Sequence, residues 1–173
     1  PLNKIIYDLN NLKLDEGTNE FPPSNIEFVN IDSSDGATNM VPNNASAQLN
    51  IRFNTSHSAN SLEENIKKIV EKNISNTSFV SEIEFYCTAE PFLTQQGKFT
   101  DIVKRSVDEI TGLKSEFSTT GGTSDARFFK DYCEVVEFGL VGETAHQVDE
   151  NVNVSDVSKL KNIYQNILEK YFA

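Results

Sequence analysis

The spacing of apolar residues predicts a helix followed by two strands in the first third of the chain. Apolar residues recur at helical spacing over residues 2–12, and the pattern stops before Gly17. Beyond a Pro-Pro break, residues 26–31 are rich in strand-forming residues, and residues 46–54 alternate strictly between apolar and polar positions. The second strand should therefore be buried on one face and exposed on the other.

A second helix and a third strand complete the pattern up to about residue 90. Ser61-Leu62-Glu63-Glu64 has the form of a capping box, and apolar residues recur at helical spacing behind it. Residues 79–87 are predicted to form the strand that follows. The order helix, strand, strand, helix, strand predicts an α+β ferredoxin-like two-layer sandwich that lacks its first strand, which we expect upstream of Pro1.

Past Pro91 the pattern changes to that of an α/β domain. Helical spacing over residues 99–110 ends near Gly112, and residues 134–140 form the apolar run typical of strands covered on both faces. Helical spacing returns over residues 157–171. We therefore expect one domain up to residue 90 and the C-terminal part of an α/β domain after it.

Composition and charge disfavour several classes of protein. In this chain of 173 residues, 26 acids and 15 bases give a formal net charge of -11, which repels nucleic-acid backbones and anionic membrane surfaces. No apolar run approaches the roughly 20 residues of a membrane span, and no basic and apolar leader opens the chain. We expect a cytoplasmic protein with no nucleic-acid or membrane partner. Because the chain starts at Pro1, we also expect its front to be missing, and we expect Cys87 and Cys133 to be free buried thiols.

The histidines are the first candidates for chemistry, and the chain has only two. His146 follows the predicted strand at residues 134–140, and loops at the carboxyl ends of strands in open α/β sheets commonly face a crevice. Its neutral imidazole is a good metal ligand, although a structural or surface role is the alternative. His57 lies among Thr and Ser residues between a strand and a helix, which indicates a solvated loop.

Two acidic pairs are expected to be structural. Adjacent Glu63 and Glu64 could serve as general base and bridging ligand in a metallohydrolase, but helix capping and the helix dipole account for both carboxylates. Asp15 and Glu16 follow the end of a helix and are expected to be solvated.

A glycine loop and an arginine are candidates for binding anions. In Gly121-Gly122-Thr123-Ser124 the backbone N–H groups and hydroxyls could cradle an anion, or the segment could be a tight turn capped by Ser124 or Asp125 before a short helix. Arg52 projects from the polar face of a strand, where it could hold a carboxylate in bidentate fashion or serve only to solubilise the surface.

Six segments, in the right order along the chain, resemble the succinyl-diaminopimelate desuccinylases, a family of dinuclear zinc amidohydrolases related to aminoacylases and acetylornithine deacetylases. The matching segments are Leu14-Asp15-Glu16-Gly17, residues 36–43, Asn50-Ile51-Arg52-Phe53, Pro91-Phe92-Leu93-Thr94, residues 118–128 and residues 144–150. The resemblance implies a lid or dimerisation domain over residues 1–90, through which a homodimer forms. Over residues 91–173 it implies the C-terminal portion of a zinc-aminopeptidase-like catalytic domain.

The same resemblance implies roles for single residues. His146 would ligate one of two zinc ions, while Gly122 and Thr123 would hold a carboxylate end of the substrate. Arg52 would grip another carboxylate, and Asn39 would reach into the active site of the partner subunit.

Departures from the family pattern are also visible. Thr88 stands where the family carries a serine near the substrate, so the hydroxyl is kept, and Gly142 stands where many members have an asparagine that contacts substrate. The family's His-x-Asp motif, bridging Asp, catalytic Glu pair and further Glu ligand have no counterpart in the chain. We therefore expect the chain alone to be inactive and unable to hold the two zinc ions per subunit of the full-length enzyme, for which cobalt or manganese is an alternative.

For the full-length enzyme the resemblance implies hydrolysis of N-succinyl-LL-2,6-diaminopimelate to succinate and LL-2,6-diaminopimelate, in lysine and diaminopimelate biosynthesis. Two alternatives stay open. One is a dimerisation and substrate-gripping module without activity, and the other is a related acetylornithine deacetylase or carboxypeptidase.

Overall fold

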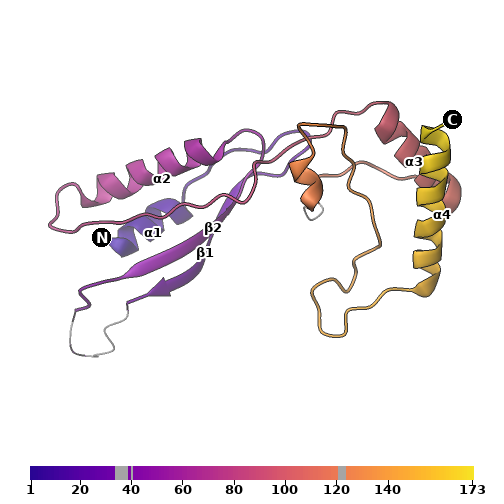
Figure 1. The fold of residues 1–173 in the computed structure, drawn as a ribbon. Helices are drawn as coiled ribbons and strands as arrows, with labels where there is room; N and C mark the ends of the chain where they lie inside the picture. Colours follow the sequence, from indigo (N-terminus) through magenta and orange to yellow (C-terminus); the bar gives the residue numbers. More distant parts are fainter. Residues whose placement is uncertain (34–38, 40, 121–123) are drawn as a thin grey trace. The chain divides into compact units, whose positions relative to one another are not determined.

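The chain divides into two compact units, Pro1–Phe92 and Leu93–Ala173, which are described separately. The structure is a computed structural model that describes all residues except 34–38, 40 and 121–123 (Figure 1). Compactness does not by itself identify the role of a unit. The assignment of residues 1–90 to a lid or dimerisation domain and of residues 91–173 to a catalytic domain therefore stays a prediction.

The first unit opens with the predicted helix and the two predicted strands. Helix α1 spans Leu2–Asn10 and buries Ile5 and Leu9. Strands β1, Asn25–Asp32, and β2, Ser46–Arg52, pair antiparallel, with Asn25 opposite Arg52 and Asp32 opposite Ser46. Along β2 every second residue is half-buried, so the half-buried strand expected from the alternating sequence is confirmed.

Helix α2 spans Ala59–Ile74, and its N-cap lies three residues before the predicted one, Ser61. Ser58 is the N-cap: its Oγ accepts the Ser61 N–H at 3.2 Å, and the Ser58 N–H donates to the Ser61 Oγ at 3.0 Å. The capping box predicted from Ser61 to Glu64 is therefore wrong, because the sequence pattern favoured a glutamate at the third position where this helix uses a serine. Glu63 and Glu64 point along the helix instead, and their carboxylates lie 2.6 Å and 3.9 Å from Lys67 and Lys68.

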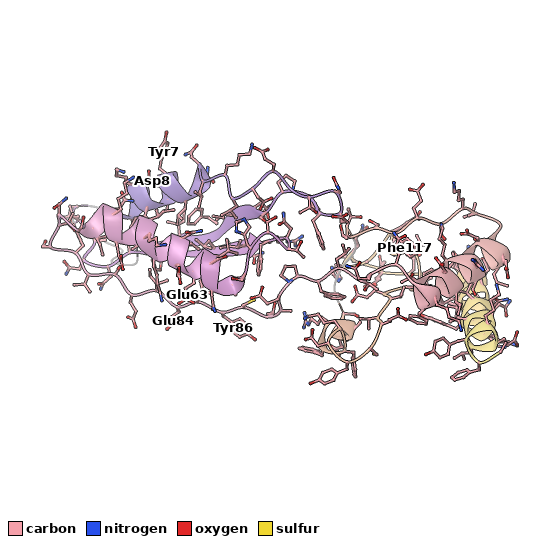
Figure 2. The ribbon with its side chains drawn as sticks, turned by 90° about the horizontal axis from the view of Figure 1, so that it is seen from above. Tyr7, Asp8, Glu63, Glu84, Tyr86 and Phe117 are labelled. Carbon is pink, nitrogen blue, oxygen red and sulfur yellow. The ribbon has the colours of Figure 1, made fainter. Side chains whose placement is uncertain are left out.

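Residues 79–87 do not form the predicted third strand. Figure 1 shows this segment as a coil that runs back along α2, and Figure 2 shows Glu84 and Tyr86 on the side of α2 opposite to Tyr7 and Asp8 of α1. Burial still alternates along it, and Ile83 and Phe85 pack against the core of the unit. A strand is defined by its ladder, and among the described residues β1 and β2 pair only with each other.

The core of the first unit lies between the two helices and one face of the sheet. Its buried residues come from α1 and α2, and the half-buried residues around them come from both strands and from the coil at residues 79–87. The buried members are Ile5, Leu9, Ile66 and Val70; the surrounding members are Phe28, Leu49, Ile51, Ile69, Ile74, Ile83 and Phe85. This part of the chain is thus a two-layer α/β unit, in which the described residues supply two strands of the predicted sandwich.

The second unit is organised around two helices. Helix α3, Lys98–Thr111, ends at Gly112, whose φ of 72° is in the left-handed region, and helix α4, Val154–Tyr171, packs against it. Both helices were predicted from their apolar spacing. Their shared core consists of Val103, Val107, Ile163 and Ile167.

The strand predicted at residues 134–140 is absent. The segment is a coil whose Val136 and Phe138 pack against the helical core. Two backbone carbonyls of the segment accept hydrogen bonds from side chains and not from a neighbouring strand. The Thr94 hydroxyl donates to the Val135 carbonyl and the Tyr164 hydroxyl to the Phe138 carbonyl, both at 2.7 Å. The prediction of a strand covered on both faces is therefore wrong in pairing and in burial, because Val136 and Phe138 are half-buried while Glu134, Glu137 and Leu140 are exposed.

Two smaller expectations can also be compared with the structure. Cys87 and Cys133 are both free, but neither is the buried thiol that was expected, because Cys87 is half-buried and Cys133 is exposed. None of the helices described is both long and apolar enough to cross a bilayer.

The position of the α2 cap gives a direct test. Ser58→Ala should lower the free energy of unfolding by about 1 kcal/mol, because the Ser61 N–H loses its acceptor. Glu64→Gln should change it little, because Glu64 is exposed and its pair with Lys68 is long. Urea unfolding followed by the helical circular dichroism signal measures both, and a larger loss for Glu64→Gln would contradict the assigned cap.

Candidate functional site

Arg52 is placed where a ligand can reach it. It is the last residue of β2, stands opposite Asn25, and is exposed. Within the part of the chain that the structure describes, no carboxylate forms an ion pair with it. The guanidinium therefore keeps its fork of donors available for an anion.

A cluster of polar side chains lies immediately beyond this end of the sheet, and we call it the Asp15 cluster. The Asp15 Oδ1 accepts the Asn54 side-chain amide at 2.8 Å and the Gly17 N–H at 2.6 Å, and the Ser24 N–H reaches the same oxygen at 3.2 Å. The His57 Nε2 lies 3.0 Å from the Asp15 Oδ2. One carboxylate thus joins the α1–β1 connection, which contains Gly17 and Ser24, to the β2–α2 connection, which contains Asn54 and His57.

The cluster corrects two predictions. Asp15 and His57 were expected to be solvated, but their side chains are only 11% and 14% exposed. Asn54, which the sequence did not single out, is 2% exposed, and its side chain also donates to the Pro22 carbonyl at 3.0 Å. The available signal was local: an aspartate two residues before a glycine favours a turn closed by its own side chain, and a short polar residue directly follows an alternating strand.

Gly17 is what allows the chain to fold back onto Asp15. Its φ of 82° lies in the left-handed region, and a Cβ there would sit 2.8 Å from the Phe21 carbonyl oxygen. The turn therefore requires glycine for both its backbone conformation and its close approach.

The electrostatics of Asp15 follow from these contacts. Burial by itself would raise the pKa of the Asp15 carboxyl, but the hydrogen bonds from Ser24, Gly17 and Asn54 outweigh burial and hold that pKa well below its ordinary range. Asp15 is consequently ionised at neutral pH, and its charge is offset by the donors around it.

Asn39 and Thr88 are both exposed and lie away from Arg52 along the chain. Asn39 belongs to the connection between β1 and β2, at the end of the sheet opposite to Arg52. Thr88 directly follows the coil at residues 79–87. Gly122 and Thr123, the predicted donors of the glycine loop, lie outside the described residues.

The segment just after the glycine loop is held from a distance in sequence. Ser124 caps a short 3-10 helix, η1, Asp125–Phe128, by accepting the Ala126 N–H at 3.1 Å, as one reading of the sequence predicted. The Glu137 Oε1 accepts both the Ser124 N–H at 2.8 Å and the Ser124 hydroxyl at 2.6 Å. Glu137 thereby fixes the point where the glycine loop rejoins the fold.

His146 lies on an exposed loop with an unusual backbone. Its φ of 63° is in the left-handed region, which is costly for a residue with a Cβ and frequent at functional sites. The loop is closed by the Thr144 Oγ1, which accepts the Asn151 N–H at 3.0 Å and donates to the Asn151 carbonyl at 2.8 Å.

At Gly142 an added Cβ would make an ordinary 3.4 Å contact with the Ala145 Cβ, so the backbone leaves room for a side chain at the position where the resemblance implies an asparagine.

A single imidazole does not make a metal centre. Among the residues described, no group of three or more His, Cys, Asp or Glu side chains is placed to hold a metal ion. The residues present therefore do not fit a pair of metal ions by themselves, and His146 is at most one member of such a set.

Comparison with known proteins identifies the family. Residues 17–170 match the model of peptidase family M20/M25/M40, and the chain belongs to that family. It is 45% identical over 174 residues to the succinyl-diaminopimelate desuccinylase of Rhodopseudomonas palustris (strain TIE-1), covering 98% of this chain and 44% of the relative. The enzyme of the same name from Bradyrhizobium sp. (strain ORS 278) is 42% identical over 172 residues, covering 99% of this chain and 45% of the relative.

A third relative gives the same result. The succinyl-diaminopimelate desuccinylase of Nitrobacter hamburgensis is 45% identical over 160 residues, covering 92% of this chain and 41% of the relative. The resemblance stated from the six segments is thus confirmed. The chain spans less than half the length of these curated relatives.

The depressed pKa of Asp15 predicts how stability depends on pH. Because the folded pKa is below the unfolded one, the ionised carboxylate stabilises the fold above about pH 4, and this contribution is lost as pH falls through the acid range. Asp15→Asn should therefore lower the free energy of unfolding by about 2 kcal/mol at pH 7, and the difference from wild type should shrink below about pH 4. Urea midpoints measured for both proteins between pH 2.5 and 7 give this difference as a function of pH.

A neighbouring acid provides the control. Glu16 is 81% exposed, and Lys13 is its only ion-pair partner among the described residues, so Glu16→Gln should neither lower the free energy of unfolding at neutral pH nor show a difference from wild type that shrinks in acid. If the difference in unfolding free energy between Asp15→Asn and wild type stays constant down to pH 2.5, the charge of Asp15 does not stabilise the fold.

Proposed function

We propose that this chain is the part of a succinyl-diaminopimelate desuccinylase that carries its lid and much of its substrate contact. The reaction adds water across the amide of N-succinyl-LL-2,6-diaminopimelate and releases succinate and LL-2,6-diaminopimelate, in lysine and diaminopimelate biosynthesis. The observation that supports it most is that relatives bearing this name match 92% to 99% of the chain at 42% to 45% identity.

Arg52 is proposed as a carboxylate clamp. The substrate carries one carboxylate on the succinyl group and two on diaminopimelate, so a binding residue with paired donors is required. An exposed guanidinium at the end of a paired strand, with no ion pair to a described carboxylate, has the chemistry to bind one of them in bidentate fashion. Thr88, Gly122 and Thr123 are proposed as further substrate contacts.

His146 is proposed as one ligand of a metal pair, zinc or cobalt. Because the described residues do not form a metal centre, the remaining ligands and the catalytic glutamate would come from polypeptide outside residues 1–173. The left-handed backbone at His146 supports a functional role, since such strain is costly unless the site requires it.

A homodimer through residues 1–90 is proposed from the geometry of the sheet. Arg52 ends β2, a strand roughly 20 Å long, and Asn39 belongs to the connection at the other end of the sheet, so the two residues are proposed to serve different active sites. Asn39 would then serve the partner's site. The outer edge of β1, where Val29 and Ile31 are 59% and 55% exposed, is the proposed contact surface.

The ferredoxin-like sandwich itself is part of the proposal. Residues 79–87 keep a strand-like alternation of burial and pack on the same core as β2, although they have no ladder partner among the described residues. A further strand from outside residues 1–173 would supply that partner and complete the sheet.

Substitution of Arg52 tests the clamp. In the active protein that contains this chain, Arg52→Ala should raise KM for N-succinyl-LL-2,6-diaminopimelate roughly 10- to 100-fold, with Arg52→Lys in between, because a fork of two hydrogen bonds to a charged group is lost. Steady-state kinetics measures this. Arg105→Ala, on the exposed face of α3, is the matched control and should leave KM unchanged.

The choice of substrate distinguishes the alternatives. Faster hydrolysis of N-acetylornithine than of the succinyl substrate would replace the proposed activity with that of an acetylornithine deacetylase. An unchanged KM in Arg52→Ala would remove Arg52 as the clamp.

A protein consisting of residues 1–173 alone tests whether this chain forms the dimer and whether the metal site needs further polypeptide. We expect size-exclusion chromatography with light scattering to show a dimer that Ile31→Lys converts to a monomer, because a charge is then placed on the proposed edge. We expect zinc titration to show no stoichiometric binding of two ions and no turnover. Two bound ions together with turnover would instead show that this chain holds the whole site.

A further inference from the structure

The Asp15 cluster lies at the one end of the sheet that carries Arg52. Arg52 pairs with Asn25, and the next residue on that side of β1 is Ser24, while Asn54 follows Arg52 by two positions. The Asn54 N–H donates to the Ser24 Oγ at 3.0 Å, so the two chain segments leaving the sheet are tied to each other. Both are also tied to the Asp15 carboxylate.

These hydrogen bonds lie at an end of the sheet, where the two strands would otherwise fray. A two-stranded antiparallel sheet is marginally stable, and its ends fray first. The opposite end, from Asp32 and Ser46, continues into the connection that contains Asn39. Hydrogen bonds from Gly17, Ser24, Asn54 and His57 onto one buried carboxylate close the Arg52 end instead.

A purely stabilising role could be filled by apolar side chains. Replacing a buried ionic network with well-packed apolar residues is often neutral or stabilising, whereas directional hydrogen bonds fix one geometry. Asn54 of the cluster follows Arg52 by two residues, and Arg52 has no ion pair with a described carboxylate. The fixed geometry of the cluster can therefore determine where the Arg52 guanidinium lies.

We propose that Asp15, together with Asn54 and His57, forms a positioning site for Arg52: it locks the end of the β1–β2 sheet so that the guanidinium is presented to the substrate carboxylate in one place. This inference rests on the proposed clamp role of Arg52. Asp15 itself is a positioning residue, because it acts through the sheet end and not through the substrate.

Asp8 provides a matched control in the same unit. Its carboxylate also accepts a side-chain amide, from Asn73 at 2.9 Å, and a lysine, Lys4, at 3.2 Å. Asn73 lies fourteen residues after the first residue of α2, roughly 20 Å along the helix, so these bonds are made at its far end. Asp8→Asn therefore removes a comparable carboxylate without touching the Arg52 end of the sheet.

The first measurement is hydrogen exchange on residues 1–173. The Asn54 N–H donates to Ser24 and not to Asp15, so it reports on the sheet end indirectly. Asp15→Asn should speed its exchange about tenfold or more, and Asp8→Asn should not. Unchanged exchange at Asn54 in Asp15→Asn would overturn the proposal whatever the activity of the protein.

The second measurement is a double-mutant cycle in the active protein that contains this chain. Asp15→Asn should raise KM for N-succinyl-LL-2,6-diaminopimelate about tenfold with kcat little changed, and it should add almost nothing in an Arg52→Ala background. Asp8→Asn should leave KM unchanged. Additive effects of Asp15→Asn and Arg52→Ala would overturn the positioning role, whereas a KM unaffected by Arg52→Ala would overturn the clamp itself.

Discussion

The first unit depends on one buried negative charge. The Asp15 carboxylate receives hydrogen bonds from the segment after α1, from the segment before β1, from the residue beyond β2 and from the residue before the α2 cap. A carboxylate that is only 11% exposed is tolerated only when its oxygens are satisfied, so all of these segments must be in place together. The arrangement of helices and strands in this unit is therefore coupled to a single side chain that connects them.

The same charge distribution affects what the protein can bind. With a net charge of -11, this chain repels an anionic ligand, but salt screens this repulsion beyond roughly 10 Å. At short range the local groups decide, and there Arg52 presents a cation that no described carboxylate neutralises. The Asp15 carboxylate is satisfied by donors within the unit, whereas Arg52, two residues before Asn54 of the Asp15 cluster, forms no ion pair with a described carboxylate.

The second unit contributes its candidate groups from loops. His146 has a left-handed backbone on a loop closed by Thr144 and Asn151, and Glu137 holds the residue that follows the glycine loop. Loops held at their ends by side-chain hydrogen bonds can place a ligand without a supporting sheet. Among the described residues, no group of three or more His, Cys, Asp or Glu side chains that could hold a metal ion surrounds these loops.

The sequence by itself determined the helices α1, α3 and α4, the half-buried alternation of β2 and the family, because periodicity and ordered motifs are local properties of the chain. It predicted strands at residues 79–87 and 134–140, but both are coils, because a strand exists only when another backbone supplies its hydrogen bonds. The cap of α2 moved to Ser58 because two serines close the box that a glutamate pattern suggested. The Asp15 cluster was decided by tertiary structure alone: Asp15 and His57 are 42 residues apart, and only the folding of α1, the sheet and α2 onto one another brings an apparently solvated acid and histidine into a single buried contact.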